Sequence, residues 1–179
     1  MVYRKANKSD INNIAMLVTK LLGTCNISKN NTPDLVQIHN KNIEEIMKNI
    51  RNYYICQEDN NIIGACGISD LKEKNIYGLD LKGYKEILYL VVDNNYQRKG
   101  IGTKLLELCC ENNDCPIIYE AWGDKEEVNS KVLLERCGFK LIKDLGDTYY
   151  KDNGYCPYCI NRNKNCNKCK AQIWIKRWL

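Results

Sequence analysis

The sequence predicts a single α/β domain in which a mixed sheet carries helices on both faces. Three observations lead to this prediction. The chain has 179 residues, enough for one hydrophobic core and short for two. Its apolar residues change between strand-like and helix-like spacing in the order β-α-α-β-β-β-α-β-α-β-β. The strand–helix–strand unit at the centre predicts one parallel pair inside an otherwise antiparallel sheet.

The N-terminal part of the chain is expected to form one strand and two helices. Residues 2–6 have the composition of a short strand, and Ser9 or Asp10 can cap the helix that follows. Residues 32–34, Thr-Pro-Asp, combine an N-cap, a proline in the first turn and an early acid, so a second helix begins there and runs to about Ile50.

The remaining elements surround the strand–helix–strand unit. A hairpin is expected from two apolar runs joined by the turn at residues 58–61. A helix that ends at Gly138, whose position is typical of a C-cap, follows later in the chain. The predicted strands are 53–57, 62–71, 86–92, 117–122, 139–143 and 171–178, and the predicted helices are 102–111 and 126–136.

The turn after strand 86–92 has the composition of a pyrophosphate-binding site. It reads Gln97-Arg98-Lys99-Gly100-Ile101-Gly102 and leads directly into a helix. Glycines let the backbone approach a phosphate closely, and the free N–H groups of the first helical turn favour an anion. The motif is neither the dinucleotide fingerprint G-x-G-x-x-G nor the P-loop.

This segment resembles the core motif Q/R-x-x-G-x-G/A of the GNAT acetyltransferase superfamily. The helix and strand start at residues 130–139, which end in Gly138-Phe139, resemble the second motif of that family. The resemblance implies a GNAT-like acyl-CoA N-acyltransferase fold, acetyl-CoA as donor, and an amine-bearing small molecule or protein as acceptor. It also implies that the cofactor is bound by Leu90, Val91, Val92, Gln97, Arg98, Lys99, Gly100, Ile101, Gly102, Thr103 and Asn129.

Direct transfer to an amine needs a group that accepts a proton. Members of the family that use a glutamate base place it where Glu86 stands here, although Glu86 could also be an ordinary solvated residue at a strand end. The family often uses a tyrosine as the acid, but that position is Leu134 in this chain. Either the thiolate leaves without a dedicated acid, or another group substitutes for the tyrosine. Tyr149 is the expected substitute, and Tyr150 and Cys137 are further candidates by their neighbourhood in the sequence.

Four of the eleven cysteines form C-x₂-C-x₆-C-x₂-C, namely Cys156, Cys159, Cys166 and Cys169. Four thiolates at this spacing predict a structural Zn²⁺ site, with an iron–sulfur cluster next and disulfides last. The cysteines lie in an insertion, residues 153–170, within the final hairpin of a single domain that spans 1–179. We expect the metal to rigidify a loop beside the acceptor site.

The basic charge is concentrated at this end of the chain. Residues after position 150 carry a net charge of +6, whereas the first 150 residues carry −1. A solvated basic face is favoured over a nucleic-acid interface, because aromatic residues for base stacking are few. The sequence has no long apolar run and no apolar N-terminal segment, so we expect a cytoplasmic protein without membrane contact, either a monomer or a homodimer. The alternative function is a non-catalytic module that binds acyl-CoA or nucleic acid.

Overall fold

The computed structural model describes residues 1–22, 35–71, 75–111, 113–123, 128, 130–147 and 170–177. Within these residues the fold is a mixed α/β sandwich, as predicted. The helices are α1 (Ile11–Leu22), α2 (Leu35–Asn49), α3 (Ile101–Glu111) and α4 (Lys131–Arg136). The strands are β1 (Val2–Lys5), β2 (Tyr53–Glu58), β3 (Asn61–Asp70), β4 (Asn75–Ile76), β5 (Leu79–Asp80), β6 (Lys85–Val92), β7 (Ile117–Gly123), β8 (Lys140–Gly146) and β9 (Lys170–Lys176).

Seven of these strands form one sheet in the order β1-β2-β3-β6-β7-β9-β8. All neighbours in it are antiparallel except β6 and β7, which are parallel. The predicted hairpin of β2 and β3 and the predicted parallel pair are therefore confirmed. The last strand of the chain, β9, lies between β7 and β8 rather than at an edge.

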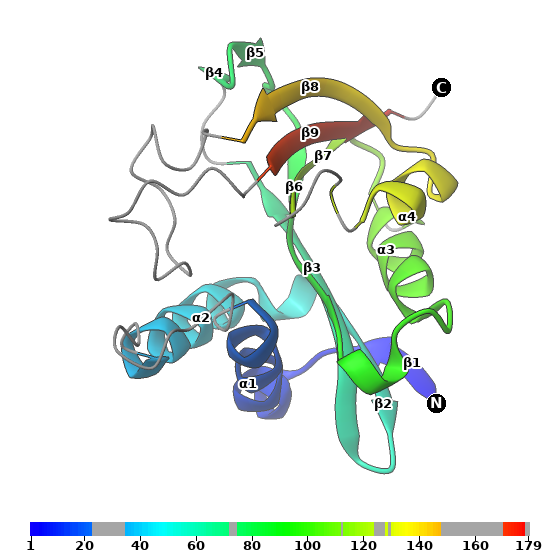
Figure 1. The fold of residues 1–179 in the computed structure, drawn as a ribbon. Helices are drawn as coiled ribbons and strands as arrows, with labels where there is room; N and C mark the ends of the chain where they lie inside the picture. Colours follow the sequence, from blue (N-terminus) through cyan, green and yellow to red (C-terminus); the bar gives the residue numbers. More distant parts are fainter. Residues whose placement is uncertain are drawn as a thin grey trace.

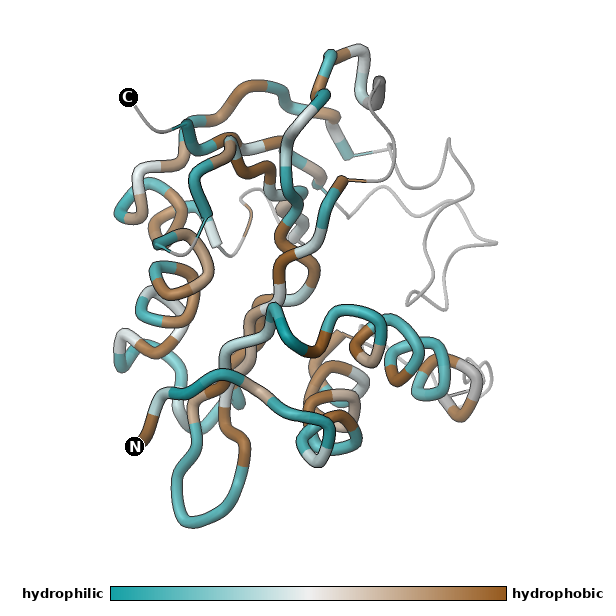
Figure 2. Tube along the Cα trace, turned by 180° about the vertical axis from the view of Figure 1, so that it is seen from behind, coloured by the Kyte–Doolittle hydropathy of each residue, from teal (hydrophilic) through white to brown (hydrophobic). Residues whose placement is uncertain are grey.

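Helices cover both faces of the sheet (Figure 1). One layer contains α1 and α2, and the other contains α3 and α4. Successive residues of the central strands alternate between the two layers. Ile55 belongs to the apolar cluster below α1 and α2, whereas Cys56 belongs to the cluster below α3. Figure 2 shows the apolar residues on the strands and on the helix surfaces that face them.

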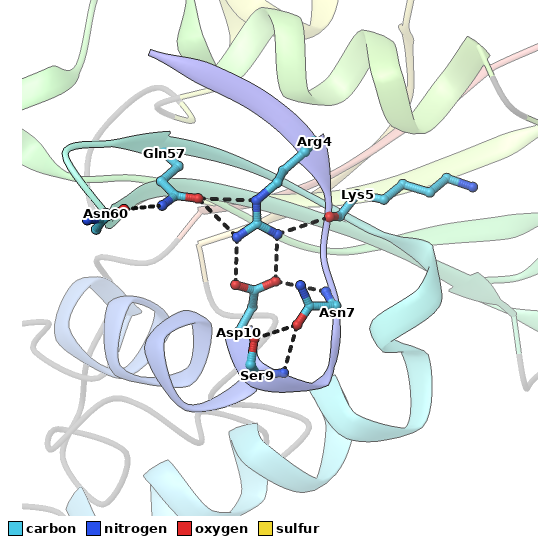
Figure 3. A network of polar contacts seen from close by, with 7 residues as sticks. All are labelled: Arg4, Lys5, Asn7, Ser9, Asp10, Gln57 and Asn60. Atoms are coloured by element: carbon cyan, nitrogen blue, oxygen red, sulfur yellow. Dashed lines mark hydrogen bonds and ion pairs between the residues drawn. The ribbon is translucent and has the colours of Figure 1, made fainter.

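A polar network fixes the start of the first helix layer (Figure 3). The cap is Asn7 rather than Ser9 or Asp10, because a 3₁₀ turn at Lys8–Asp10 precedes α1 and Asn7 Oδ1 accepts from the Ser9 N–H at 2.8 Å. The Asp10 carboxylate accepts from the Asn7 N–H at 2.8 Å, which completes a capping box. The same carboxylate binds both terminal nitrogens of Arg4, at 2.8 and 2.9 Å, so β1 is tied to α1.

Three details of the fold differ from the expectation or lie outside it. The small β4–β5 hairpin was not predicted, because two-residue strands carry no recognisable periodicity. The helix predicted from residue 126 is described only over Lys131–Arg136. The predicted start of the second helix at residues 32–34 lies outside the described residues. None of the described helices is long and apolar enough to cross a membrane.

Candidate active site

The centre of the sheet opens between β6 and β7. The two strands pair only at Lys85 with Ile117 and at Glu86 with Ile118. On its other edge β7 pairs with β9 along its whole length, from Ile117 to Gly123. After Glu86, β6 continues to Val92 without pairing with β7. The edge of β6 that faces β7 is therefore not paired with β7 after Glu86.

An irregularity of β6 lies next to this opening. Cys66 of β3 is opposite Leu90, but Ile68 is opposite Ile87, so β6 has one residue more than β3 over this stretch. Leu88 and Tyr89 both pack against the cluster below α1 and α2, whereas a regular strand would alternate. Such a bulge re-aims side chains and leaves part of the backbone outside the ladder.

Glu86 is placed where β6 leaves β7. It is half-buried, and its Oε1 accepts a hydrogen bond from the Ser69 hydroxyl at 3.1 Å. Ser69 is almost fully buried and is opposite Glu86 in the β3–β6 ladder. This hydrogen bond fixes one carboxylate oxygen, so Glu86 is held at the opening and is not a freely solvated strand end.

The glycine turn follows β6 and leads into α3. Its backbone reaches the left-handed region at Arg98, with φ 61°, and at Gly100, with φ 80°. Glycine adopts this conformation without strain, whereas other residues pay for it. At Gly100 an added Cβ would meet nothing within 4 Å, so the outer side of the turn is open. The first N–H groups of α3 follow directly and have no partner within the helix.

Two residues predicted to bind the cofactor have structural roles in this turn. Gln97 donates from Nε2 to the carbonyl oxygen of Val92 at 3.2 Å and to Asn94 Oδ1 at 2.9 Å, which folds the turn back onto β6. Gly102 allows helix packing, because an added Cβ would lie 2.9 Å from Cδ1 of Leu133 in α4. Lys99 lies over the Tyr96 ring, with Nζ 4.9 Å from its centre.

The turn is also connected to the first helix. Lys20 of α1 forms an ion pair with Asp93 at 2.8 Å. The hydrogen bond from Lys20 holds the pKa of Asp93 below its usual value, and a second bond from the Asn95 N–H acts in the same direction. The start of the turn is thereby fixed to α1.

The position of the expected acid belongs to the core. Leu134 lies in α4 and is fully buried in the apolar cluster that includes α3, so a hydroxyl would have no place there without repacking. Burial raises the pKa of Cys137, and its thiol is directed to the carbonyl oxygen of Thr103. Burial also raises the pKa of Tyr119 on β7, which keeps its proton and which sequence patterns did not single out.

Several predicted site residues lie outside the described residues. These are Asn129, Tyr149, Tyr150 and the four cysteines Cys156, Cys159, Cys166 and Cys169. Among the residues that the structure does describe, no group of three or more His, Cys, Asp or Glu side chains could hold a metal ion. The zinc site therefore stays a prediction.

The comparisons with known proteins agree with this arrangement. Residues 49–141 match the family model of the acetyltransferase (GNAT) domain, a stretch that includes β6, the glycine turn and Gly138. No protein of curated function matches the chain by sequence. The chain belongs to the GNAT acetyltransferase family.

Solved structures show the same fold at low identity. An N-acetyltransferase from Staphylococcus aureus Mu50 is 15% identical with a TM-score of 0.67, and 98% of this chain and 97% of that one are covered. The ribosomal-protein-alanine N-acetyltransferase of Brucella melitensis is 15% identical, with a TM-score of 0.65 and coverage of 99% and 100%. The yncA protein of Salmonella typhimurium, solved with its cofactor acetyl-CoA, is 16% identical, with a TM-score of 0.62 and coverage of 99% and 93%.

Proposed function

We propose that this protein transfers the acetyl group of acetyl-CoA to a primary amine by direct attack. The observation that carries the proposal is the separation of β6 from β7 beside the glycine turn. A strand edge that β7 leaves unpaired beyond Glu86, among the residues that the structure describes, and an open helix N-terminus then lie in sequence along one path. A donor with an extended amide-containing arm and a pyrophosphate suits both parts.

In this proposal the donor binds along β6 and α3. The main chain of Leu90, Val91 and Val92 hydrogen-bonds the pantetheine arm in the manner of an added strand. The backbone of residues 98–103 binds the pyrophosphate, aided by the dipole of α3 and by the cationic side chains. Gln97 contributes by holding the turn in shape. Asn129 is assigned to the far part of the donor.

The chemistry at the opening needs a base. The amine nitrogen attacks the thioester carbon, the carbon–sulfur bond breaks, and the nitrogen loses a proton. Glu86 accepts this proton directly or through water, with the hydrogen bond from Ser69 fixing its orientation. The departing thiolate takes a proton from solvent or from Tyr149, since Leu134 cannot supply one.

A structural Zn²⁺ bound by the four cysteines forms the second part of the proposal. Four thiolates at this spacing match the ligand set of tetrahedral zinc. They lie between β8 and β9, which are antiparallel neighbours, so a metal there would close the connection. One zinc per chain by metal analysis, lost in a Cys156→Ser/Cys159→Ser variant, supports the site. Visible absorbance from an iron–sulfur cluster contradicts it.

The proposal is tested by donor binding and turnover together. We expect acetyl-CoA to raise the melting temperature, and thiol to be released when amines are added. The panel contains an amino amide, a polyamine, an aminoglycoside and a lysine peptide. Donor binding without thiol release on any amine would favour the non-catalytic acyl-CoA-binding module instead. Salt-dependent binding of RNA or DNA would favour the nucleic-acid alternative.

A further inference from the structure

Leu88 and Tyr89 form the bulge of β6, and neither neighbouring strand pairs with them among the residues that the structure describes. On one side, the β3 register passes from Ile87 directly to Leu90. On the other side, β7 pairs with β6 only up to Glu86. The regular ladder of the sheet therefore does not fix this stretch of β6, and its position depends on the side chains that it carries.

Both side chains of the bulge are directed to the layer of α1 and α2, where they pack against its apolar cluster. Tyr89 also has a polar partner in this layer, because its hydroxyl donates to Oδ1 of Asn42 in α2 at 3.1 Å. Apolar packing has no preferred direction, whereas a hydrogen bond requires a narrow range of distance and angle. The contact of Tyr89 with Asn42 therefore specifies where the bulge lies relative to α2.

Asn42 is itself held in place by further polar contacts. Its side chain is fully buried, and Nδ2 donates to the Thr19 hydroxyl of α1 at 3.0 Å. Thr19 Oγ1 lies 3.3 Å from Nδ1 of His39, the single histidine of the chain. Loss of a hydrogen bond by a buried amide is costly, so Asn42 has little freedom to move. The bulge of β6 is thus connected to both helices of one layer (Figure 1).

The residues that follow the bulge are those assigned to the pantetheine arm. Leu90, Val91 and Val92 come directly after Tyr89, and their register against β3 begins with the pair of Leu90 and Cys66. Along an antiparallel pair, residues alternate between bonding the partner strand and directing their N–H and C=O groups away from it. The place of the bulge therefore decides which of these main-chain groups face the opening.

Building on the proposed binding of acetyl-CoA, we propose that Tyr89 is a positioning residue for the donor. Its hydrogen bond to Asn42 holds the bulge, and the bulge holds the main chain of residues 90–92 in the arrangement that binds the pantetheine arm. The glycine turn has supports of its own, namely Gln97 and the ion pair of Lys20 with Asp93. The pyrophosphate end of the donor is therefore independent of Tyr89.

The experiment separates the two ends of the donor. Titration calorimetry measures the binding of acetyl-CoA and of ADP, which has the pyrophosphate but no pantetheine arm, to the native protein and to Tyr89→Phe. We expect the Kd of acetyl-CoA to rise about 3- to 10-fold, the range of one hydrogen bond, and the Kd of ADP to change less than about twofold. A general loosening of the protein would affect both ligands and would not produce this difference.

Two further variants test the partner and the control. Asn42→Leu removes the acceptor of the same hydrogen bond, so it should weaken acetyl-CoA binding selectively, and the double variant should lose no more than the weaker-binding single variant. The matched control is Tyr53→Phe. It removes a hydroxyl from the same apolar cluster, one that makes no hydrogen bond within the described part of the chain, and it should leave both Kd values unchanged.

Three results overturn the inference and leave the proposed function in place. An equal loss of affinity for both ligands means that Tyr89→Phe acts on the fold as a whole. Unchanged binding of acetyl-CoA means that the bulge keeps its place without the hydroxyl. Losses that multiply in the double variant mean that Tyr89 and Asn42 act separately. A native protein that does not bind acetyl-CoA refutes the proposed function itself, and the inference with it.

Discussion

The contact between Gly67 and Tyr53 predicts a strong effect of a single added methyl group. In Gly67→Ala the new Cβ would lie 2.3 to 2.6 Å from three atoms of the Tyr53 ring. Carbon atoms that are not bonded prefer separations of about 3.5 to 4.0 Å, so the ring has to move by more than about 1 Å. The ring is fully buried and rigid, and overpacking of this kind costs about 1–3 kcal/mol.

A double-mutant cycle isolates this contact from other effects of the substitution. Tyr53→Leu replaces the ring with a side chain too short to cross Gly67, at a cost of its own from lost burial. In that background Gly67→Ala should cost little. The coupling energy between the two positions is therefore expected to be about 1–3 kcal/mol.

Urea denaturation of the native protein, both single variants and the double variant gives the four free energies of unfolding. An equal cost of Gly67→Ala in the native protein and in the Tyr53→Leu variant would show that the added methyl group does not act through the Tyr53 ring. The free energy of unfolding should fall with urea concentration at the same slope in all four proteins. A slope that differs between variants would show that the unfolding was no longer two-state and would require a second probe.

Three further predictions concern other parts of the molecule. Glu86→Gln should lower kcat about 100- to 1000-fold while the acetyl-CoA-induced shift in melting temperature persists, and unchanged turnover would exclude Glu86 as the base. Gly100→Ala and Gly83→Ala introduce similar backbone strain, at φ 80° and 82°, so each should lose about 1–2 kcal/mol, but only Gly100→Ala should weaken acetyl-CoA binding in calorimetry. Asp10→Asn should lower the free energy of unfolding by about 2 kcal/mol at pH 7, whereas the exposed Asp70→Asn should not. Hydrogen bonding to Arg4 lowers the pKa of Asp10, so this stabilisation is present above the unfolded-state pKa near 3.8 and is lost as pH falls through the lower folded-state value. In thermal melts from pH 7 to 3, the melting temperatures of the native protein and of Asp10→Asn should therefore converge at the acidic end.

The fold was predictable because strong local patterns coincided with tertiary structure. The apolar run that ends at Val92 and the glycines that follow it specified a strand, a turn and a helix without ambiguity. The order of elements then left few topologies, and the parallel pair at Glu86 is one consequence. Strand ends and caps were less predictable, as the cap at Asn7 shows, since a 3₁₀ turn intervenes before α1.

The site was predictable in part. Glu86 and the glycine turn could be proposed as site residues from the sequence alone, because they are local in sequence and follow a motif. Ser69 could not, because its contact with Glu86 depends on the register of β3 against β6 and on a bulge. The packing of the Tyr53 ring over β3 had one local signal, Gly67, because a glycine within an apolar strand indicates close approach by another group.

In the proposed function acetyl-CoA lies in the opening between β6 and β7. A crystal structure of the protein with acetyl-CoA would show whether it does. We expect the pantetheine arm along the main chain of Leu90 to Val92, the pyrophosphate against the backbone of residues 98–103, and the acetyl carbon on the Glu86 side of the bulge. Acetyl-CoA bound elsewhere, with β6 and β7 closed against each other, would contradict it.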